Sequence, residues 1–150
     1  MAITPYIVRR LGAGNNNPDI EYFDVDASQN IIAGNFVVVA AGLAQNAVAA
    51  TTAEIVGLAN GGYQNGATAT TGKPLPAVLA KNSVIRMNFT DAGTKKTFTR
   101  ADLYGALYGL SDAVTLNPDD TTGGFLQVVD FDNTNKTVDV VVAAAAQYLV

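Results

Sequence analysis

Cysteine, histidine and tryptophan are all absent from this chain of 150 residues. Without cysteine and histidine, the protein can form no disulfide, no thiolate or imidazole metal site, and no nucleophile of the Ser-His-Asp or Cys-His type. A glycosidase carboxylate pair is also disfavoured, because the only glutamates, Glu21 and Glu54, lie in unrelated segments. We therefore expect no enzymatic activity, no catalytic residue, no metal site and no cofactor.

Charge and long apolar runs are scarce as well. Charged residues make up 15% of the chain, against about 25% in an average globular protein. The net charge is -4 and the basic residues are scattered, so no basic stripe is available to bind nucleic acid. The longest apolar runs, residues 36–44 and 140–146, are far shorter than the ~18–20 residues that span a bilayer. No secretory signal is predicted, because the N-terminal charges follow the short apolar run instead of preceding it.

What the chain does contain is a succession of short apolar segments separated by turn residues. Asn35–Ala40 is a continuous β-branched run, typical of a strand that is buried on both faces. Phe125–Phe131 and Thr137–Ala143 flank a turn at residues 132–135 and predict a β-hairpin. No segment shows a sustained helical period. The expected fold is therefore all-β, a small single-domain β-barrel or β-sandwich.

The strand pattern occurs twice. The last third, from Asp102 to Ala143, reads as strand, turn, strand, turn, strand, turn, strand. A looser version runs from Ile32 to Asn60. In both, a strand led by glycine is followed by a short strand, a Thr-Thr step, and a strand led or interrupted by glycine: Gly57 in one copy, Gly123 and Gly124 in the other.

Several local expectations complete the prediction. Ala47–Thr51 is expected to be a strand, and Leu75–Ala80 an edge strand because Pro76 cannot donate a ladder hydrogen bond. Thr99–Asp102 has the spacing of a capping box, with room for one helical turn. Residues 143–146 are compatible with a helical turn or a strand end. Asn60–Gly72 is a long loop, either functional or a flexible hairpin tip.

Residues 1–30 differ from the rest, and we divide the chain into an extended N-terminal arm and loop (1–30) and a β-domain (31–150). Gly12–Asp19 carries the signals of a loop, and Ile20–Asp26 alternates as a strand or extended arm would. The apolar side chains of Ile3–Val8 need a place to be buried. That place is either the chain's own barrel or a neighbouring subunit.

Two motifs were tested and set aside. Gly66–Lys73 resembles a phosphate-binding loop, but it has five residues between its glycines where four are needed, and Pro74 where a Ser or Thr is required. A cluster of oxygen ligands in the C-terminal hairpin could in principle bind calcium, but Asp and Asn are also the default residues of turns. That cluster consists of Asp130, Asp132, Asn133, Asn135 and Asp139.

The C-terminal strands resemble the head decoration (cement) proteins of tailed bacteriophages. The resemblance is carried by Asp102–Leu110, Ala113–Leu116, Thr121–Val129 and Thr137–Val142. The looser copy, residues 32–39 and 55–59, looks like the opening strands of the same family. The match covers roughly residues 31–143 and consists of a pattern of small residues, Val and Gly, not of a rare motif.

The resemblance implies a structural virion protein, made in the host cytoplasm, that binds the outer surface of the mature capsid and cements adjacent capsomers. Its expected partners are the major capsid protein and two further copies of itself in a homotrimer, with no nucleic acid and no membrane. The residues that we expect to contact the capsid or a sister subunit are Ile3, Pro5, Tyr6, Ile7, Arg9, Arg10 and Tyr63.

Two alternatives remain open. One is a head-fibre or tail-associated module. The other is a carbohydrate-binding adhesion domain in which Tyr63, Tyr104 and Tyr108 stack on sugar rings, since two tyrosines four residues apart share one face of a strand. The simpler interpretation of the three tyrosines is that they are core or interface aromatics.

Overall fold

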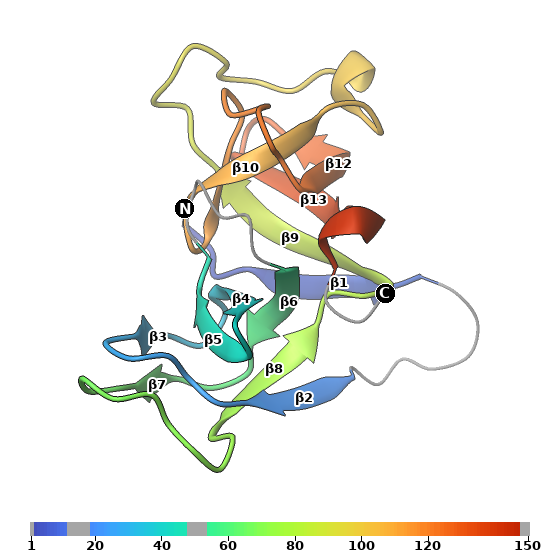
Figure 1. The fold of residues 1–150 in the computed structure, drawn as a ribbon. Helices are drawn as coiled ribbons and strands as arrows, with labels where there is room; N and C mark the ends of the chain where they lie inside the picture. The colour runs from blue at the N-terminus through green and yellow to red at the C-terminus, as the bar shows by residue number, and fades with distance from the viewer. Residues whose placement is uncertain (1, 12–18, 48–53, 148–150) are drawn as a thin grey trace.

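The computed structural model describes residues 2–11, 19–47 and 54–147. The protein is all-β, as predicted, and its two main sheets form two lobes of one molecule (Figure 1). In the described residues the helical elements are two 3₁₀ turns, η1 (Arg100–Asp102) and η2 (Ala144–Ala146). None of the helical segments in the described ranges has the length and apolar character needed to cross a membrane.

The C-terminal lobe is a closed β-barrel of five strands. The sheet order is β9-β11-β10-β12-β13, and β13 pairs back onto β9 to close the ring. The pair between β11 and β9 is parallel and the others are antiparallel. The strands of this C-terminal barrel are β9 (Ser83–Phe89), β10 (Leu107–Asp112), β11 (Thr115–Asn117), β12 (Leu126–Asp132) and β13 (Thr137–Val142).

The N-terminal lobe also contains five strands, in the order β2-β8-β6-β4-β5. Its two edges meet where Val25, just beyond β2, forms a parallel bridge with Ala44 of β5. We call this lobe the N-terminal barrel. Its strands are β2 (Ile20–Phe23), β4 (Phe36–Ala40), β5 (Leu43–Asn46), β6 (Glu54–Ala59) and β8 (Leu75–Leu79). A small two-stranded sheet, β3 (Asn30–Ile31) with β7 (Tyr63–Gln64), lies beside it.

The two barrels have the same topology. In chain order, β2, β4, β5, β6 and β8 correspond to β9, β10, β11, β12 and β13: the same neighbours pair in the same directions, and the closing pair is parallel in both. The closing hydrogen bonds also correspond, since Asp26 N–H donates to the Ala44 carbonyl and Thr90 N–H to the Leu116 carbonyl, both at 3.0 Å. The doubled sequence pattern thus reflects a doubled topology, and each structural copy is longer than the pattern indicated.

A shared core joins the barrels into a single domain. Strand β4 is buried on both faces, as predicted: Phe36 and Val38 pack with the core of the C-terminal barrel, and Val37 packs inside the N-terminal barrel. Strand β6 is shared in the same way. Ile55 and Leu58 pack in the core of the C-terminal barrel, and Val56 and Ala59 pack in the N-terminal barrel. Each strand in the middle therefore stabilises two interiors at once.

The N-terminal segment is extended and lies along its own chain. β1 (Tyr6–Arg10) pairs antiparallel with β9, with a bulge at Val8 between the pairs Ile7–Ile85 and Arg9–Val84. Within the chain itself, Ile7 is partly buried against the core of the C-terminal barrel, whereas Tyr6 remains 46% exposed. Burial against a neighbouring subunit stays a prediction. Ile20–Phe23 is a strand of the N-terminal barrel, and the predicted loop before it, residues 12–18, lies outside the described residues.

The predictions for the C-terminal segments are confirmed. The hairpin of β12 and β13 turns where Asp132 accepts hydrogen bonds from the backbone N–H groups of Thr134 and Asn135. Val138, Val140 and Val142 are buried together. The capping box holds the single turn η1, in which Thr99 N–H donates to the Asp102 carboxylate at 2.7 Å. Residues 144–146, undecided from sequence, form the 3₁₀ turn η2.

One strand prediction was wrong, and another falls mostly outside the described residues. β8 is not an edge strand, because it lies between β2 and β6. Its proline is tolerated because Pro76 lies one residue beyond the last β6–β8 pair, where its carbonyl still accepts from Asn60 N–H. The strand expected at Ala47–Thr51 begins earlier, at Leu43, because a tight turn at residues 41–42 folds it directly back on β4. Residues 48–51 lie outside the described residues.

Candidate binding surface at the N-terminal strands

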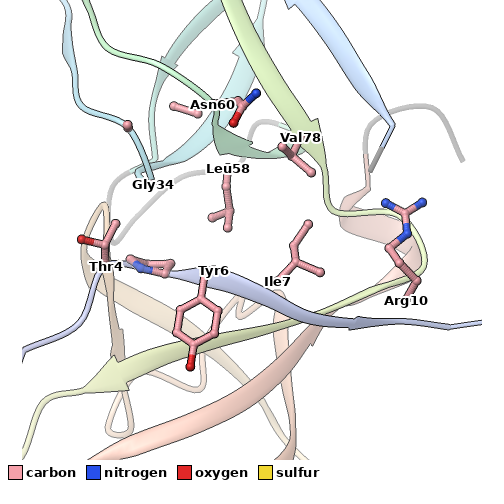
Figure 2. A pocket seen from close by; sticks show the side chains of 11 residues that line it. Thr4, Tyr6, Ile7, Arg10, Gly34, Leu58, Asn60 and Val78 are labelled. Carbon is pink, nitrogen blue, oxygen red and sulfur yellow. The ribbon is translucent and has the colours of Figure 1, made fainter. Parts of the chain in front are cut away.

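A cleft of about 560 Å³ separates β1 from the outer face of the N-terminal barrel (Figure 2). Its volume falls in the range of small-molecule and side-chain binding sites. One wall comes from the N-terminal segment and the other from strands β6 and β8 and from the loop before β4. In Figure 2, Ile7 of β1 and Leu58 and Val78 of the barrel point toward one another across the cleft, whereas the Tyr6 ring points away from it on the other side of β1. Arg10 and Asn60 also line it.

The N-terminal segment approaches the barrel closely at one end of this cleft. Gly34 has a φ of +90°, and a Cβ built there would lie 2.0 Å from the Thr4 Cγ2 atom. Any other residue would therefore be strained at this φ, and the Thr4 side chain would have to move to make room for it. Pro5, the residue after Thr4, is buried. The segment before β1 thus packs closely against the loop before β4, and β1 itself pairs with β9.

Arg10 provides the charge in the cleft. Its side chain is only 13% exposed, and its Nη2 atom donates to Asp19 Oδ2 at 3.0 Å. Its Nη1 atom is buried and has no hydrogen-bond partner. A buried guanidinium N–H without an acceptor is costly, so a ligand that brings an oxygen to this atom would be stabilised.

The N-terminal segment is rich in exposed apolar side chains. Six large hydrophobic residues of the described chain are markedly exposed, and four of them lie between residues 6 and 22. These are Tyr6, Leu11, Ile20 and Tyr22, with exposed fractions of 46%, 43%, 41% and 57%. Tyr6 lies on β1, Leu11 just after it, and Ile20 and Tyr22 on β2. Most of the large exposed apolar side chains of the described chain thus belong to its N-terminal segment, which makes this segment the candidate for a contact surface.

The structure brings together four of the seven residues predicted to bind. Pro5, Tyr6, Ile7 and Arg10 all line the cleft. Of the others, Ile3 lies in a separate hollow, where its N–H donates to the Asn88 Oδ1 atom. The two remaining positions are Arg9, which is exposed on β1, and Tyr63, which packs against the core of the N-terminal barrel through β7.

The opposite wall of the cleft was not predicted. In the sequence, Leu58 and Val78 are ordinary strand residues. They line a cleft only because β1 lies opposite them in the folded chain. Gly34 carried a weak signal as the glycine before a strand. Asn60, just after β6, is the first residue of the long loop that the sequence left as either functional or flexible.

The three tyrosines considered as a sugar platform do not form one. Tyr108 is buried in the core of the C-terminal barrel, with 2% of its surface exposed. Tyr104 is 66% exposed and lies with a φ of 58° in the turn after η1, not on β10. The prediction that these two share a strand face was therefore wrong, because β10 begins only at Leu107.

The oxygen-rich C-terminal turn is occupied by protein donors. Asp139 pairs with Arg86 through two hydrogen bonds of 2.7 and 2.9 Å, and Asn133 exchanges two bonds with the backbone of Phe98. Hydrogen bonds from the side chain and backbone of Asn135 hold the pKa of Asp132 below its ordinary value. Within the described ranges no group of three or more His, Cys, Asp or Glu side chains could hold a metal ion.

Two ion pairs fix the neighbourhood of the C-terminal barrel. The hydrogen bonds that Arg86 donates to the Asp139 carboxylate raise the pKa of Arg86 further above its already high ordinary value. Lys95 Nζ bonds the Asp102 carboxylate and lies 5.0 Å from the centre of the Phe98 ring. Burial alone would raise the pKa of Asp102, but the bonds from Lys95 and Thr99 lower it below its ordinary value. Each of these pairs holds its two side chains in a fixed orientation.

Comparison with known proteins finds no matching family model, no matching curated protein and no matching solved structure. The fold defines the class only as an all-β module of two barrels, with several exposed apolar side chains in its N-terminal segment.

Proposed function

We propose that this protein is a structural component of a tailed-bacteriophage virion, and that it binds the outer surface of the capsid and cements adjacent capsomers. It acts without enzymatic chemistry, and it works as a homotrimer whose partner is the major capsid protein. The proposal combines the sequence resemblance over residues 31–143 with the contact surface on the N-terminal strands.

The observation that carries the proposal is the placement of the exposed apolar residues. Tyr6 is one of the residues expected to contact the capsid, and Leu11, Ile20 and Tyr22 follow it within the first thirty residues. Arg10, also expected to contact the capsid, lines the cleft and has a buried N–H without a partner among the described residues. A protein with so few charges elsewhere gains little from long-range electrostatics, so this apolar patch is the surface best suited to hold a partner.

A cementing role follows from this surface by mass action. A protein that binds only the mature shell stabilises it relative to every other state. Three linked copies bind more tightly than one, because the second and third contacts form at a high effective concentration. A contact surface that binds the capsid only weakly in a single copy is therefore sufficient for a cementing role.

The first experiment is quantitative protein composition of purified virus particles from the natural source. We expect a copy number equal to that of the major capsid protein or a simple fraction of it. Absence from the particles, or only a few copies in each, would contradict the proposal.

The second experiment tests the surface itself. Deletion of residues 1–11 is not a clean test, because it would strip β1 from β9. We would instead compare Tyr6→Ser and Tyr22→Ser with the control Tyr104→Ser, which changes an exposed tyrosine in the turn after η1, outside the N-terminal segment. We expect the first two to lose binding to capsids that lack the protein, and the control to bind normally. Equal binding by all three variants would rule out the N-terminal patch.

A further inference from the structure

The internal duplication reveals a strand position that is filled in one barrel and empty in the other. Strand β9 carries two neighbours on one edge: β11 along its C-terminal end and β1 along its N-terminal half. Its counterpart β2 has the equivalent of β11, which is β5, bridged through Val25. Within the described residues no strand occupies the place on β2 that corresponds to β1. Figure 1 shows β1 alongside β9, and β2 at the margin of its lobe.

The backbone directions identify the empty position. The closing bridges align Val25 with Phe89, so that Tyr22 corresponds to Arg86 and Ile20 to Val84. Arg86 and Val84 are the residues of β9 that pair with Tyr6 and Arg9 of β1.

On β2, the Asp24 carbonyl and Asp26 N–H point toward β5. Because backbone groups alternate along a strand, those of Ile20 and Tyr22 point to the same edge, away from β8. The edge of β2 therefore offers the same donors and acceptors that β9 uses to hold β1.

The side chains at this edge are also uncovered. Ile20 is 41% exposed and Tyr22 is 57% exposed, whereas the equivalent Val84 on β9 is completely buried. A strand edge with unpaired backbone groups and exposed apolar side chains is a template for another strand.

The charges around β2 indicate which kind of strand would bind at its edge. The segment that contains β2 carries four carboxylates and no basic residue: Asp19, Glu21, Asp24 and Asp26. Among the described residues, these carboxylates form one ion pair, between Asp19 and Arg10. Two copies of β2 would place Glu21 opposite Glu21, which is unfavourable. A strand with basic residues is favoured, and β1, the strand bound at the equivalent edge, ends in Arg9-Arg10.

We propose that the outer edge of β2, at Ile20–Tyr22, binds an extended segment of another protein that combines apolar and basic residues, and that this segment adds to the N-terminal barrel as an antiparallel strand. Each chain has two such edges but only one β1, which already lies on β9. The second strand therefore comes from a partner. This inference does not depend on the proposed function, because it concerns the isolated protein.

The test uses a peptide with the sequence of Thr4–Leu11, TPYIVRRL, as the probe, since this strand is known to fit the equivalent edge. Amide hydrogen exchange of the intact protein is followed by NMR with and without the peptide. We expect the amide protons of Ile20 and Tyr22 to exchange quickly in the free protein and to become protected when the peptide binds. A peptide with both arginines changed to glutamate is the matched control and should give no protection.

Variants of the intact protein locate the binding site. Ile20→Lys and Glu21→Lys each add a positive charge at the edge and should weaken peptide binding about tenfold or more. Tyr104→Ser, far from β2 in sequence and on the other barrel, should bind normally. Circular dichroism confirms that each variant is folded, and Glu21→Gln serves as the milder change.

Three results would overturn the inference. The first is protection confined to Val84 and Arg86, which would mean that the peptide only replaces β1. The second is equal binding of the two peptides. The third is binding that none of the β2 variants weakens. Failure of capsid binding would leave these outcomes unchanged, so the two proposals are tested separately.

Discussion

The two barrels of this protein share one topology but are filled with side chains of different size. The closing pair is Phe89 with Leu116 in the C-terminal barrel and Val25 with Ala44 in the N-terminal barrel. The first interior adds Phe98 and Tyr108, whereas the second relies largely on valine and alanine. The comparison shows that the order and direction of the strands do not depend on the volume of the core, provided that backbone pairing is preserved.

The barrels also differ in what completes them. β1 covers one edge of the C-terminal barrel, and the small sheet β3–β7 covers part of the N-terminal one. The long loop before β8, proposed from sequence to be either functional or flexible, is bound there: Asn65 N–H donates to the Gln29 carbonyl and Thr70 N–H to the Val25 carbonyl. The shared core of Phe36, Val38 and the strands of the other barrel then makes the two lobes interdependent.

The largest effect should come from removing the aromatic centre of the C-terminal barrel. Phe98 is 1% exposed and packs edge-on against Phe89 and Tyr108, with ring centres 5.0 and 5.4 Å apart. Phe98→Ala should lower the free energy of unfolding by about 3–5 kcal/mol, because it leaves a cavity in a packed core. Urea titrations followed by far-ultraviolet circular dichroism and by tyrosine fluorescence measure this loss.

The same titrations test whether the barrels unfold together. Because they share a core, we expect the two probes to give one coincident transition in Phe98→Ala as in the wild type. Two separated transitions would show that the N-terminal barrel is stable alone. Tyr104→Ala, on the same barrel but exposed, is the control and should change stability little.

The next effect concerns two glycines, one in each barrel, that lie tightly against the backbone of a neighbouring strand. A Cβ at Gly57 in β6 would lie 1.8 Å from the Val78 carbonyl oxygen, and one at Gly124, just before β12, would lie 2.2 Å from that of Leu107. Both obstacles are backbone atoms, which cannot move without shifting a strand. Gly57→Ala should therefore cost about 1–3 kcal/mol, measured by thermal or urea denaturation.

The matched control for this change is Gly66→Ala. A Cβ at Gly66 would meet no atom within 4 Å. It should leave stability nearly unchanged. If Gly57→Ala were as stable as this control, the close approach of β6 and β8 would be disproved.

A smaller effect is the pH dependence of stability that comes from the ion pair beside the C-terminal barrel. Asp102, whose pKa is held below its ordinary value near 3.8, stabilises the fold when it is ionised. Its contribution is complete above the pKa of the unfolded chain and is lost as the pH falls through the lower folded pKa. Lys95, whose pKa is raised, stays charged throughout this window. Asp102→Asn should cost about 1 kcal/mol at neutral pH, since the pair is partly exposed.

Urea titrations of Asp102→Asn and wild type across the acidic range measure this difference. We expect the two stabilities to converge below the folded pKa of Asp102. If the stability difference between wild type and Asp102→Asn were as large at the lowest pH as at neutral pH, the hydrogen bonds of Asp102 and not its charge would supply the stabilisation.

The local features of this fold follow from the sequence much better than its contact surface does. The hairpin of β12 and β13 and the capping box at Thr99–Asp102 were predicted because each is encoded within a few residues. Strand β8 was misplaced at an edge because the position of a proline within a ladder depends on where its neighbour ends. The cleft required knowing that β1 lies beside β9, a pairing of residues about 80 positions apart in sequence.

The smallest effect on stability bears most directly on function. Ile20→Thr and Tyr22→Thr alter exposed side chains on an edge that has no strand partner in the described residues, so each should change the free energy of unfolding by less than about 0.5 kcal/mol. The equivalent change on β9, Val84→Thr, places a hydroxyl at a completely buried position and should cost more than either. Denaturation of the three variants measures the contrast. Equal losses would show that the β2 edge is already covered, whereas the expected contrast identifies it as a surface kept open for a partner.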